Sequence, residues 1–141
     1  MKRTKKRTRK RTRMRFPKKA SSLPIITLVV NGKKIRTEVA RSDEEKEHGL
    51  MGREDLGPRD AMLFIEDSRP SLWMKDTPTP LSAAWLSAKG KILDIVDMEP
   101  FSEQIHVSPL HTRFALEMRK GAFAALGIGK GDIVEFPPNF K

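Results

Sequence analysis

The chain has 141 residues, which is the size of one ordinary domain with a single hydrophobic core. Its 28 lysines and arginines exceed its 18 aspartates and glutamates, so the formal net charge is +10 at pH 7. The sequence has no cysteine, which excludes disulfide bonds, thiolate metal sites and a cysteine nucleophile.

The positive charge belongs to one segment at the start of the chain. Residues 1–19 contain twelve lysines and arginines and no acidic residue, whereas residues 20–141 contain 16 basic and 18 acidic residues. A segment with few apolar side chains and many like charges cannot offset the entropy of ordering its backbone, so we expect a disordered tail. Residues 20–24 are predicted to be a linker to a folded domain at 25–141.

We interpret this polybasic tail as a segment that binds nucleic acid, either DNA or RNA. Neutralising phosphates releases condensed counterions, which gives strong, salt-dependent binding without sequence selectivity. A localisation signal and an anionic membrane surface are the alternatives, although the tail has few side chains able to insert into a membrane. The side chains expected to contact phosphates are Lys2, Arg3, Lys5, Lys6, Arg7, Arg9, Lys10, Arg11, Arg13, Arg15, Lys18 and Lys19.

A hairpin and a helix are predicted after the linker. The runs 25–30 and 33–40 flank Asn31-Gly32, a pair that supplies the positive φ angles of a type I′ turn. The motif Ser42-Asp43-Glu44-Glu45 is typical of a capping box. It predicts a short helix at about 43–48.

Seven further strands are predicted, separated by proline or glycine turns. Turn signals this frequent favour a mainly β domain, an antiparallel sandwich-like or barrel-like fold with one or two short helices. A second hairpin turn is expected at Lys89-Gly90, and a short helical segment at 122–126. The strands are expected at 61–65, 72–75, 81–87, 91–98, 104–107, 114–118 and 133–136.

A series of motifs resembles the DUF192 family. In chain order they are His48-Gly49-Leu50-Met51-Gly52-Arg53, Ala61-Met62-Leu63-Phe64, Trp73-Met74-Lys75-Asp76-Thr77 with Pro80-Leu81, Leu116-Glu117 with Gly121, and Gly127-Ile128 with Gly131-Asp132. The resemblance covers roughly residues 35–136, and its most distinctive part is the Trp-Met-Lys block. It implies a mainly β, sandwich-like domain and no established biochemical activity.

The sequence departs from that family in three places. Many members begin with a signal peptide, where this chain has its basic tail. Ala61 stands where members commonly have glycine, and Ser82 stands where they commonly have aspartate. A ligand that relied on that aspartate would lack it here.

The Trp-Met-Lys block is also a candidate wall of a small-molecule pocket. In a strand, Leu72 and Met74 face one side and Trp73 and Lys75 the other, so one of these bulky side chains faces outward or lies between layers. An exposed Trp beside a Lys and an Asp offers stacking and polar orientation, which makes Trp73, Lys75 and Asp76 possible ligand-pocket residues. The alternative is that Trp73 fills the core and Asp76 caps a rigid proline turn.

Catalytic and metal-binding motifs are weak or absent. The three histidines, His48, His106 and His111, lack the spacing of a metal site, so we expect no metal and no cofactor. The sequence has no Gly-x-Ser-x-Gly motif, and the glycine-rich segment 127–132 lacks the Ser or Thr that follows the lysine of a phosphate loop. We therefore assign no catalytic residue.

These features favour a non-enzymatic structural or accessory protein, anchored by its tail to nucleic acid in a nucleoprotein assembly such as a ribosome-like particle, a virion or a nucleoid. Neighbouring proteins of that assembly are further expected partners. The alternative is a ligand-binding or catalytic β domain that the tail localises, and a third interpretation is a protein-interaction module with an exposed apolar patch. Because no apolar run approaches the roughly 20 residues that span a bilayer, we expect a cytoplasmic or particle-bound protein that is neither exported nor inserted into a membrane.

Overall fold

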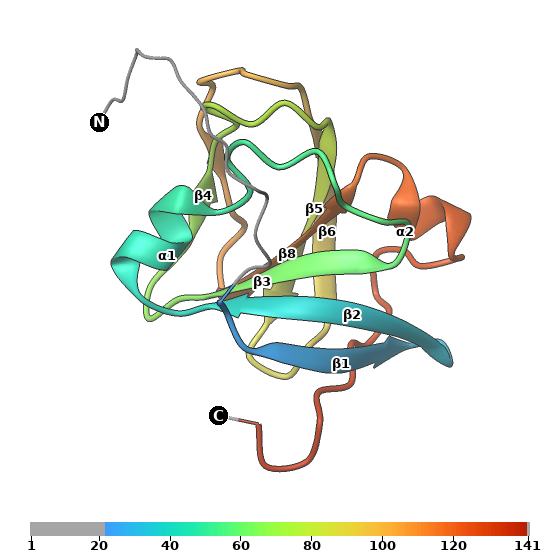
Figure 1. Cartoon of the computed structure of the whole chain (residues 1–141). Coiled ribbons are helices and arrows are strands. Elements are labelled where there is room, and N and C mark those ends of the chain that lie inside the picture. The colour runs from blue at the N-terminus through green and yellow to red at the C-terminus, as the bar shows by residue number, and fades with distance from the viewer. Residues whose placement is uncertain (1–21, 141) are drawn as a thin grey trace.

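The structure is a computed structural model that describes residues 22–140, and the polybasic tail, with its predicted disorder and phosphate contacts, lies outside this range. The described part is mainly β, as predicted, with a six-stranded sheet, a two-stranded sheet and two short helices (Figure 1). The strands are β1 (Ile25–Val30), β2 (Lys33–Ala40), β3 (Asp60–Ile65), β4 (Ser71–Leu72), β5 (Leu81–Ser87), β6 (Ile92–Met98), β7 (His106–Val107) and β8 (Thr112–Arg119), and the helices are α1 (Asp43–His48) and α2 (Ala122–Ala125).

Local turn chemistry forms the two hairpins where they were predicted. Asn31 and Gly32 have φ angles of 52° and 77° and join β1 to β2 in antiparallel register. Gly90, with a φ of 86°, lies in the turn that joins β5 to β6. Both turns need a backbone conformation that glycine adopts without steric cost.

The predicted capping box begins α1. The Ser42 hydroxyl accepts a hydrogen bond from the Glu45 N–H at 3.1 Å, and the Glu45 carboxylate accepts one from the Ser42 N–H at 3.0 Å. The Arg41 N–H donates to the same carboxylate, and these hydrogen bonds lower the pKa of Glu45. The helix is therefore fixed at its start by its own side chains, although none of its residues is buried.

The six-stranded sheet has the order β1-β2-β3-β8-β5-β6 and is linked across its two edges. Its β2–β3 pair is parallel and its other neighbouring pairs are antiparallel. The segment 131–135 lies between the two edges: Val29 of β1 exchanges two backbone hydrogen bonds with Glu135, and the Ile92 N–H of β6 donates to the Asp132 carbonyl. The segment 131–135 thereby links the two edge strands of the sheet, β1 and β6.

The prediction of a strand at 133–136 was wrong, because this segment connects the two edge strands of the sheet. This segment makes two isolated bridges, Val29 with Glu135 on one edge and Lys91 with Ile133 on the other. Because it passes from one edge strand to the other, it does not follow either one long enough to form a ladder.

Two other predicted strands are shorter than expected. The strand predicted at 72–75 ends after Leu72, because Asp76 has a φ of 55° and the Thr77 N–H donates to the Met74 carbonyl in a turn. The strand predicted at 104–107 is reduced to β7, which pairs with β4 over two residues.

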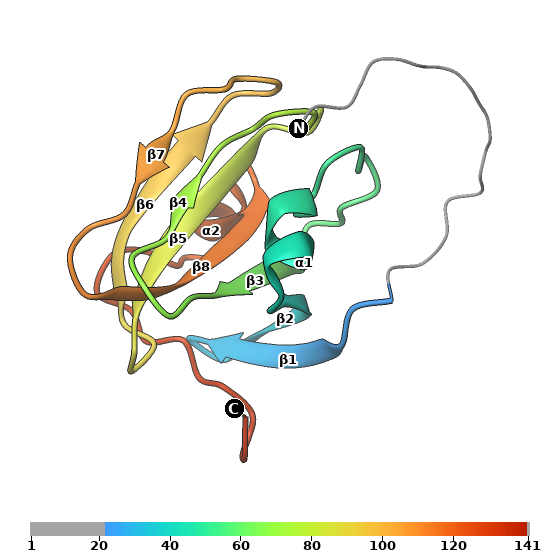
Figure 2. The same cartoon turned by 90° about the vertical axis from the view of Figure 1, so that its left-hand side faces the viewer.

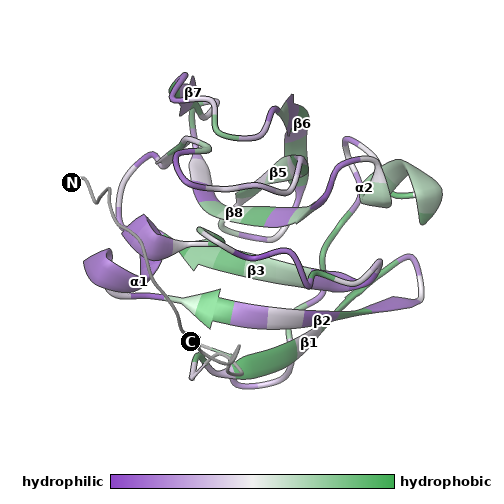
Figure 3. Cartoon of the chain, turned by 45° about the horizontal axis from the view of Figure 1, so that its top comes forward, coloured by the Kyte–Doolittle hydropathy of each residue, from purple (hydrophilic) through white to green (hydrophobic). Residues whose placement is uncertain are grey.

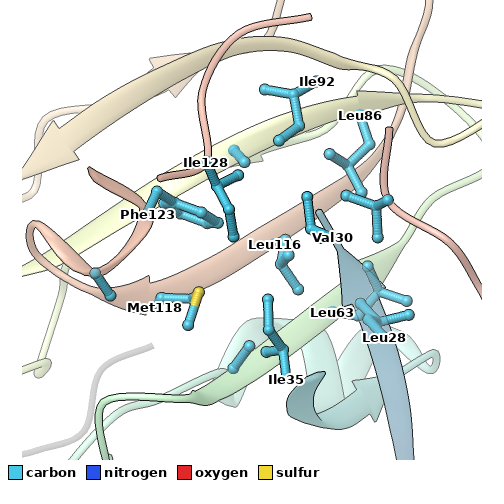
Figure 4. Packing of buried hydrophobic residues seen from close by; sticks show 14 residues of the cluster. Leu28, Val30, Ile35, Leu63, Leu86, Ile92, Leu116, Met118, Phe123 and Ile128 are labelled. Carbon is cyan, nitrogen blue, oxygen red and sulfur yellow. The ribbon is translucent and has the colours of Figure 1, made fainter. Parts of the chain in front are cut away.

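The sheet has a buried cluster of apolar side chains on each face. One cluster, called the inner cluster below, includes Leu28, Leu63 and Leu116, and α2 contributes Phe123 to it (Figure 4). The other cluster, called the outer cluster, lies on the opposite face of the sheet, the outer face, and includes Ala115. Because side chains alternate along a strand, Glu117 of β8 shares the face of Ala115 rather than that of Leu116.

The outer face is covered by α1, the loop after it and β4. Leu50, Leu56, Leu72 and Met74 pack from this layer onto the sheet. Figure 2 shows α1 and β4 on the same side of the sheet, and in Figure 3 α1 is hydrophilic whereas β1 and much of β3 are hydrophobic. The candidate site lies between α1 and this face of the sheet.

Candidate functional site

A hollow of about 240 Å³ lies between α1 and the outer face of the sheet. Its walls come from α1 and the turn after it, from β3, from the segment 71–77 and from β5 and β8. The residues that line it are Asp43, Lys46, Glu47, His48, Gly49, Leu50, Met51, Phe64, Glu66, Ser71, Leu72, Trp73, Lys75, Thr77, Leu81 and Glu117.

Glu117 is the deepest charged residue of this hollow. It lies in a central strand, opposite Met62 of β3 and Ala83 of β5, and only 3% of its surface is exposed. Within residues 22–140, its carboxyl has no hydrogen-bond or ion-pair partner. Burial raises the pKa of Glu117 to about 8, so this carboxyl carries a proton at neutral pH.

A second buried glutamate lies in the same row across the sheet. Glu38 of β2 is opposite Met62, which is in turn opposite Glu117. Arg53 neutralises Glu38 through two hydrogen bonds of 3.2 and 3.0 Å, and it also donates to Asp55 at 2.7 Å. One glutamate of the row thus has a bidentate partner, whereas the other faces the hollow.

Two lysines that line the hollow have contacts of their own. The Lys46 ammonium donates to the Ile65 carbonyl at 3.0 Å and to the Glu66 carboxylate at 2.9 Å. The Lys75 ammonium lies 5.4 Å from the centre of the Trp73 ring, a cation–π distance. Both lysines thus contact groups other than Glu117. Burial is the cause that raises the pKa of Glu117.

The structure separates the three residues predicted for a ligand pocket. Trp73 and Lys75 line the hollow together with Leu72, whereas Met74 is buried and does not line it. Asp76 does not line it: this residue is exposed in the left-handed turn, and its carbonyl accepts a hydrogen bond from the Gly52 N–H at 2.8 Å.

Sequence analysis did not assign Glu117 or Glu38 to a site. The available signal was an acidic side chain two residues from an apolar residue of the same predicted strand, and so on the same face. Glu117 follows Ala115 in that alternation, and Glu38 precedes Ala40. A glutamate on the buried face of a predicted strand marks a position that needs a partner or a function.

Ser82, which stands where the resemblance implied an aspartate, has a structural role. Its hydroxyl donates to the Asp97 carboxylate at 2.6 Å and accepts from the Gly121 N–H at 3.1 Å. It therefore ties β5 to β6 and to the start of α2, away from the hollow.

The histidines do not form a common site. His48 ends α1, His106 lies in β7 and His111 in a turn with a φ of 70°. Over residues 22–140, no group of three or more histidine, aspartate or glutamate side chains is arranged to hold a metal ion. None of the helices in the same range has the length and apolar character that a membrane crossing requires.

A second hollow and several exposed apolar side chains lie around β7. Phe101, Ile105, Val107 and Leu110 are all more than half exposed. The hollow, of about 380 Å³, includes Ser108, whose buried hydroxyl has no partner in the part of the chain that the structure describes. The third interpretation of the sequence, a protein-interaction module with an exposed apolar patch, stays a prediction, because individual exposed side chains do not identify a partner.

Comparison with known proteins places this fold in a family. The model of DUF192, described as an uncharacterized ACR, matches residues 26–136. The chain belongs to the DUF192 family. The motif resemblance and the mainly β fold that it implied are thereby confirmed.

Two solved structures are similar to this DUF192 domain. A protein of unknown function from Novosphingobium aromaticivorans DSM 12444 is 31% identical, with a TM-score of 0.77, over 82% of this chain and 88% of that chain. A Sinorhizobium meliloti 1021 protein described as "a putative transcription regulator" is 28% identical, with a TM-score of 0.76, over 84% of this chain and 98% of that chain. Comparison with curated proteins gives no match.

Proposed function

We propose that the folded part of the chain is a binding domain for a small molecule and that its site is the hollow between α1 and the sheet. The observation that carries this proposal is the carboxyl of Glu117, which is buried, faces the hollow and has no partner among the described residues. Buried carboxyls are normally paired or hydrogen-bonded, because an unpaired one destabilises the fold. A ligand that pairs with Glu117 supplies the missing partner.

A fragment-binding measurement tests this proposal. Ser71 is exposed at the rim of the hollow, so Ser71→Trp fills its mouth without disturbing the core. The matched control is Ser68→Trp, because Ser68 is also exposed but does not line the hollow. Ligand-observed NMR with a library of small amines, amides, ketones and acids is expected to show fragments that bind the full chain and Ser68→Trp but not Ser71→Trp. If Ser71→Trp binds the same fragments as Ser68→Trp, the hollow is not the site.

We further propose that the polybasic tail anchors this domain to nucleic acid in a nucleoprotein assembly. The supporting observation is the charge of residues 1–19, with twelve basic residues and no acidic one. The description of the Sinorhizobium meliloti protein as a transcription regulator is consistent with a setting on nucleic acid. On this proposal the tail supplies affinity, and the domain is the part held in place.

Salt dependence on a DNA duplex tests the anchor. If about eight basic side chains engage phosphates, the logarithm of the association constant falls with the logarithm of salt concentration with a slope of roughly −7. Replacing all twelve basic residues of the tail with glutamine is expected to abolish binding in fluorescence anisotropy. A control with the tail residues in scrambled order is expected to bind as before, since no base is read. Unchanged binding by the glutamine variant would refute the anchor.

A further inference from the structure

We infer that the ligand of the hollow is a small primary ammonium ion with a short apolar body, whose head pairs with the ionised Glu117 carboxylate. This inference rests on the proposed binding function and specifies its chemistry. It follows from which polar atoms the hollow presents at depth, which charges surround Glu117 and how large the hollow is.

The deep part of the hollow offers hydrogen-bond acceptors in an apolar wall. The lining that Glu117 shares includes Phe64, Leu72 and Leu81, all buried. The hydroxyl of Thr77 donates its proton to the Lys75 carbonyl at 3.0 Å, so its remaining lone pairs act as acceptors. A ligand head rich in N–H donors therefore matches the acceptor atoms of Thr77 and of the ionised Glu117 carboxylate.

The charged groups that face Glu117 leave it without a cation. From α1 the hollow receives Asp43, Lys46, Glu47 and His48, from the end of β3 it receives Glu66, and from the 71–77 segment it receives Lys75. Lys46 is held by Glu66 and the Ile65 carbonyl, and Lys75 lies against Trp73. An ammonium ligand is the component that completes a charge-assisted pair, and such pairs are stronger than neutral hydrogen bonds.

The volume of the hollow limits the size of the ligand. A cavity of about 150 Å³ holds a benzene ring, so a hollow of about 240 Å³ suits a molecule with on the order of six to ten heavy atoms. Hexylamine falls in this range, and hexan-2-one and hexanoate provide a neutral and an anionic probe of nearly the same size and shape.

Acid–base linkage distinguishes hexylamine from the other two probes. Because the pKa of free Glu117 is raised to about 8, hexylammonium must displace a proton below that pH. Its affinity is expected to rise about tenfold per pH unit between pH 6 and 8 and then level off, with close to one proton released per molecule bound at pH 7. A ketone or carboxylate that instead accepts a hydrogen bond from the protonated Glu117 binds with constant affinity below pH 8 and more weakly above it.

The experiment is isothermal titration of the full chain with each probe at pH 6, 7, 8 and 9, in buffers of different ionisation enthalpy. Hexylamine is expected to bind with the rising pH profile and to bind Glu117→Gln about 10- to 100-fold more weakly. Glu103→Gln is the control, because Glu103 is exposed and lies outside the hollow; it is expected to bind hexylamine as the wild type does.

Three contrary outcomes would refute, in turn, the ammonium class of the ligand, its pairing with Glu117 and the binding function. Binding of hexanone or hexanoate that Ser71→Trp abolishes, without binding of hexylamine, refutes the ammonium class and leaves the binding function in place. Hexylamine affinity that does not change in Glu117→Gln refutes the pairing with this carboxylate. Failure of every probe and every library fragment to distinguish Ser71→Trp from Ser68→Trp refutes the binding function itself.

Discussion

Replacing Glu117 with glutamine is expected to stabilise the fold, by an amount that depends on pH. Glutamine keeps the shape of the protonated acid but cannot ionise. Burial raises the pKa of Glu117 from 4.5 to about 8, so the folded chain binds more protons than the unfolded chain between these values, and the stability of the wild type falls as pH rises through this window. The shift corresponds to about 3 kcal/mol of lost stability at pH 7 and about 5 kcal/mol above pH 8, relative to a group that stays neutral.

Urea unfolding of the full chain at pH 5, 7 and 9 measures this difference. The free energy of unfolding of Glu117→Gln is expected to exceed that of the wild type by less than about 1 kcal/mol at pH 5, by about 3 at pH 7 and by about 5 at pH 9. Glu103→Gln, at an exposed position, is expected to stay within about 0.5 kcal/mol of the wild type. A Glu117→Gln difference that is the same at all three pH values would show that this carboxyl is not held in apolar surroundings.

Two further substitutions test the rest of the fold. Arg53→Met removes the bidentate partner of buried Glu38 and is expected to cost about 3 kcal/mol, most of which the double variant with Glu38→Met recovers in urea unfolding. Gly90→Ala places a Cβ against the Val134 carbonyl oxygen at a φ of 86° and is expected to cost more than about 2 kcal/mol in thermal unfolding, whereas Gly131→Ala, with open space around its Cβ, costs about 1. Equal costs for the two glycines would mean that the Val134 carbonyl does not lie against Gly90.

Local signals account for what the sequence predicted of the fold. The Asn31-Gly32 turn, the capping box at Ser42 and the turn at Gly90 each depend on residues that are neighbours in the chain, and each was found where expected. The segment 133–136 has the same alternating character as a strand, but its path between two strand edges depends on the closure of the sheet. No pattern inside four residues encodes that path.

In the candidate site, too, the residues that were predicted are close together in the sequence, and the one that was missed depends on the strand order. Trp73 and Lys75 were predicted from the stacking and polar contacts that a Trp beside a Lys and an Asp offers, and both line the hollow. Glu117 is more than forty residues further along the chain and reaches the hollow only because β8 lies between β3 and β5. Asp76 was grouped with Trp73 and Lys75 by proximity in sequence, but the strand ends at Leu72 and Asp76 lies in a left-handed turn that does not line the hollow.

The contrast between Glu38 and Glu117 is the argument for a ligand rather than a purely structural acid. Both glutamates lie in one row of the sheet, on the same face and equally buried. The loop after α1 supplies Arg53 to Glu38, so the fold is able to neutralise a carboxylate at this depth. At Glu117 it supplies instead a hollow large enough for a small molecule, with the nearby lysines held by other groups. A carboxyl that only filled space would be replaced by a neutral side chain with a gain in stability, which makes the unpaired acid a cost that binding offsets.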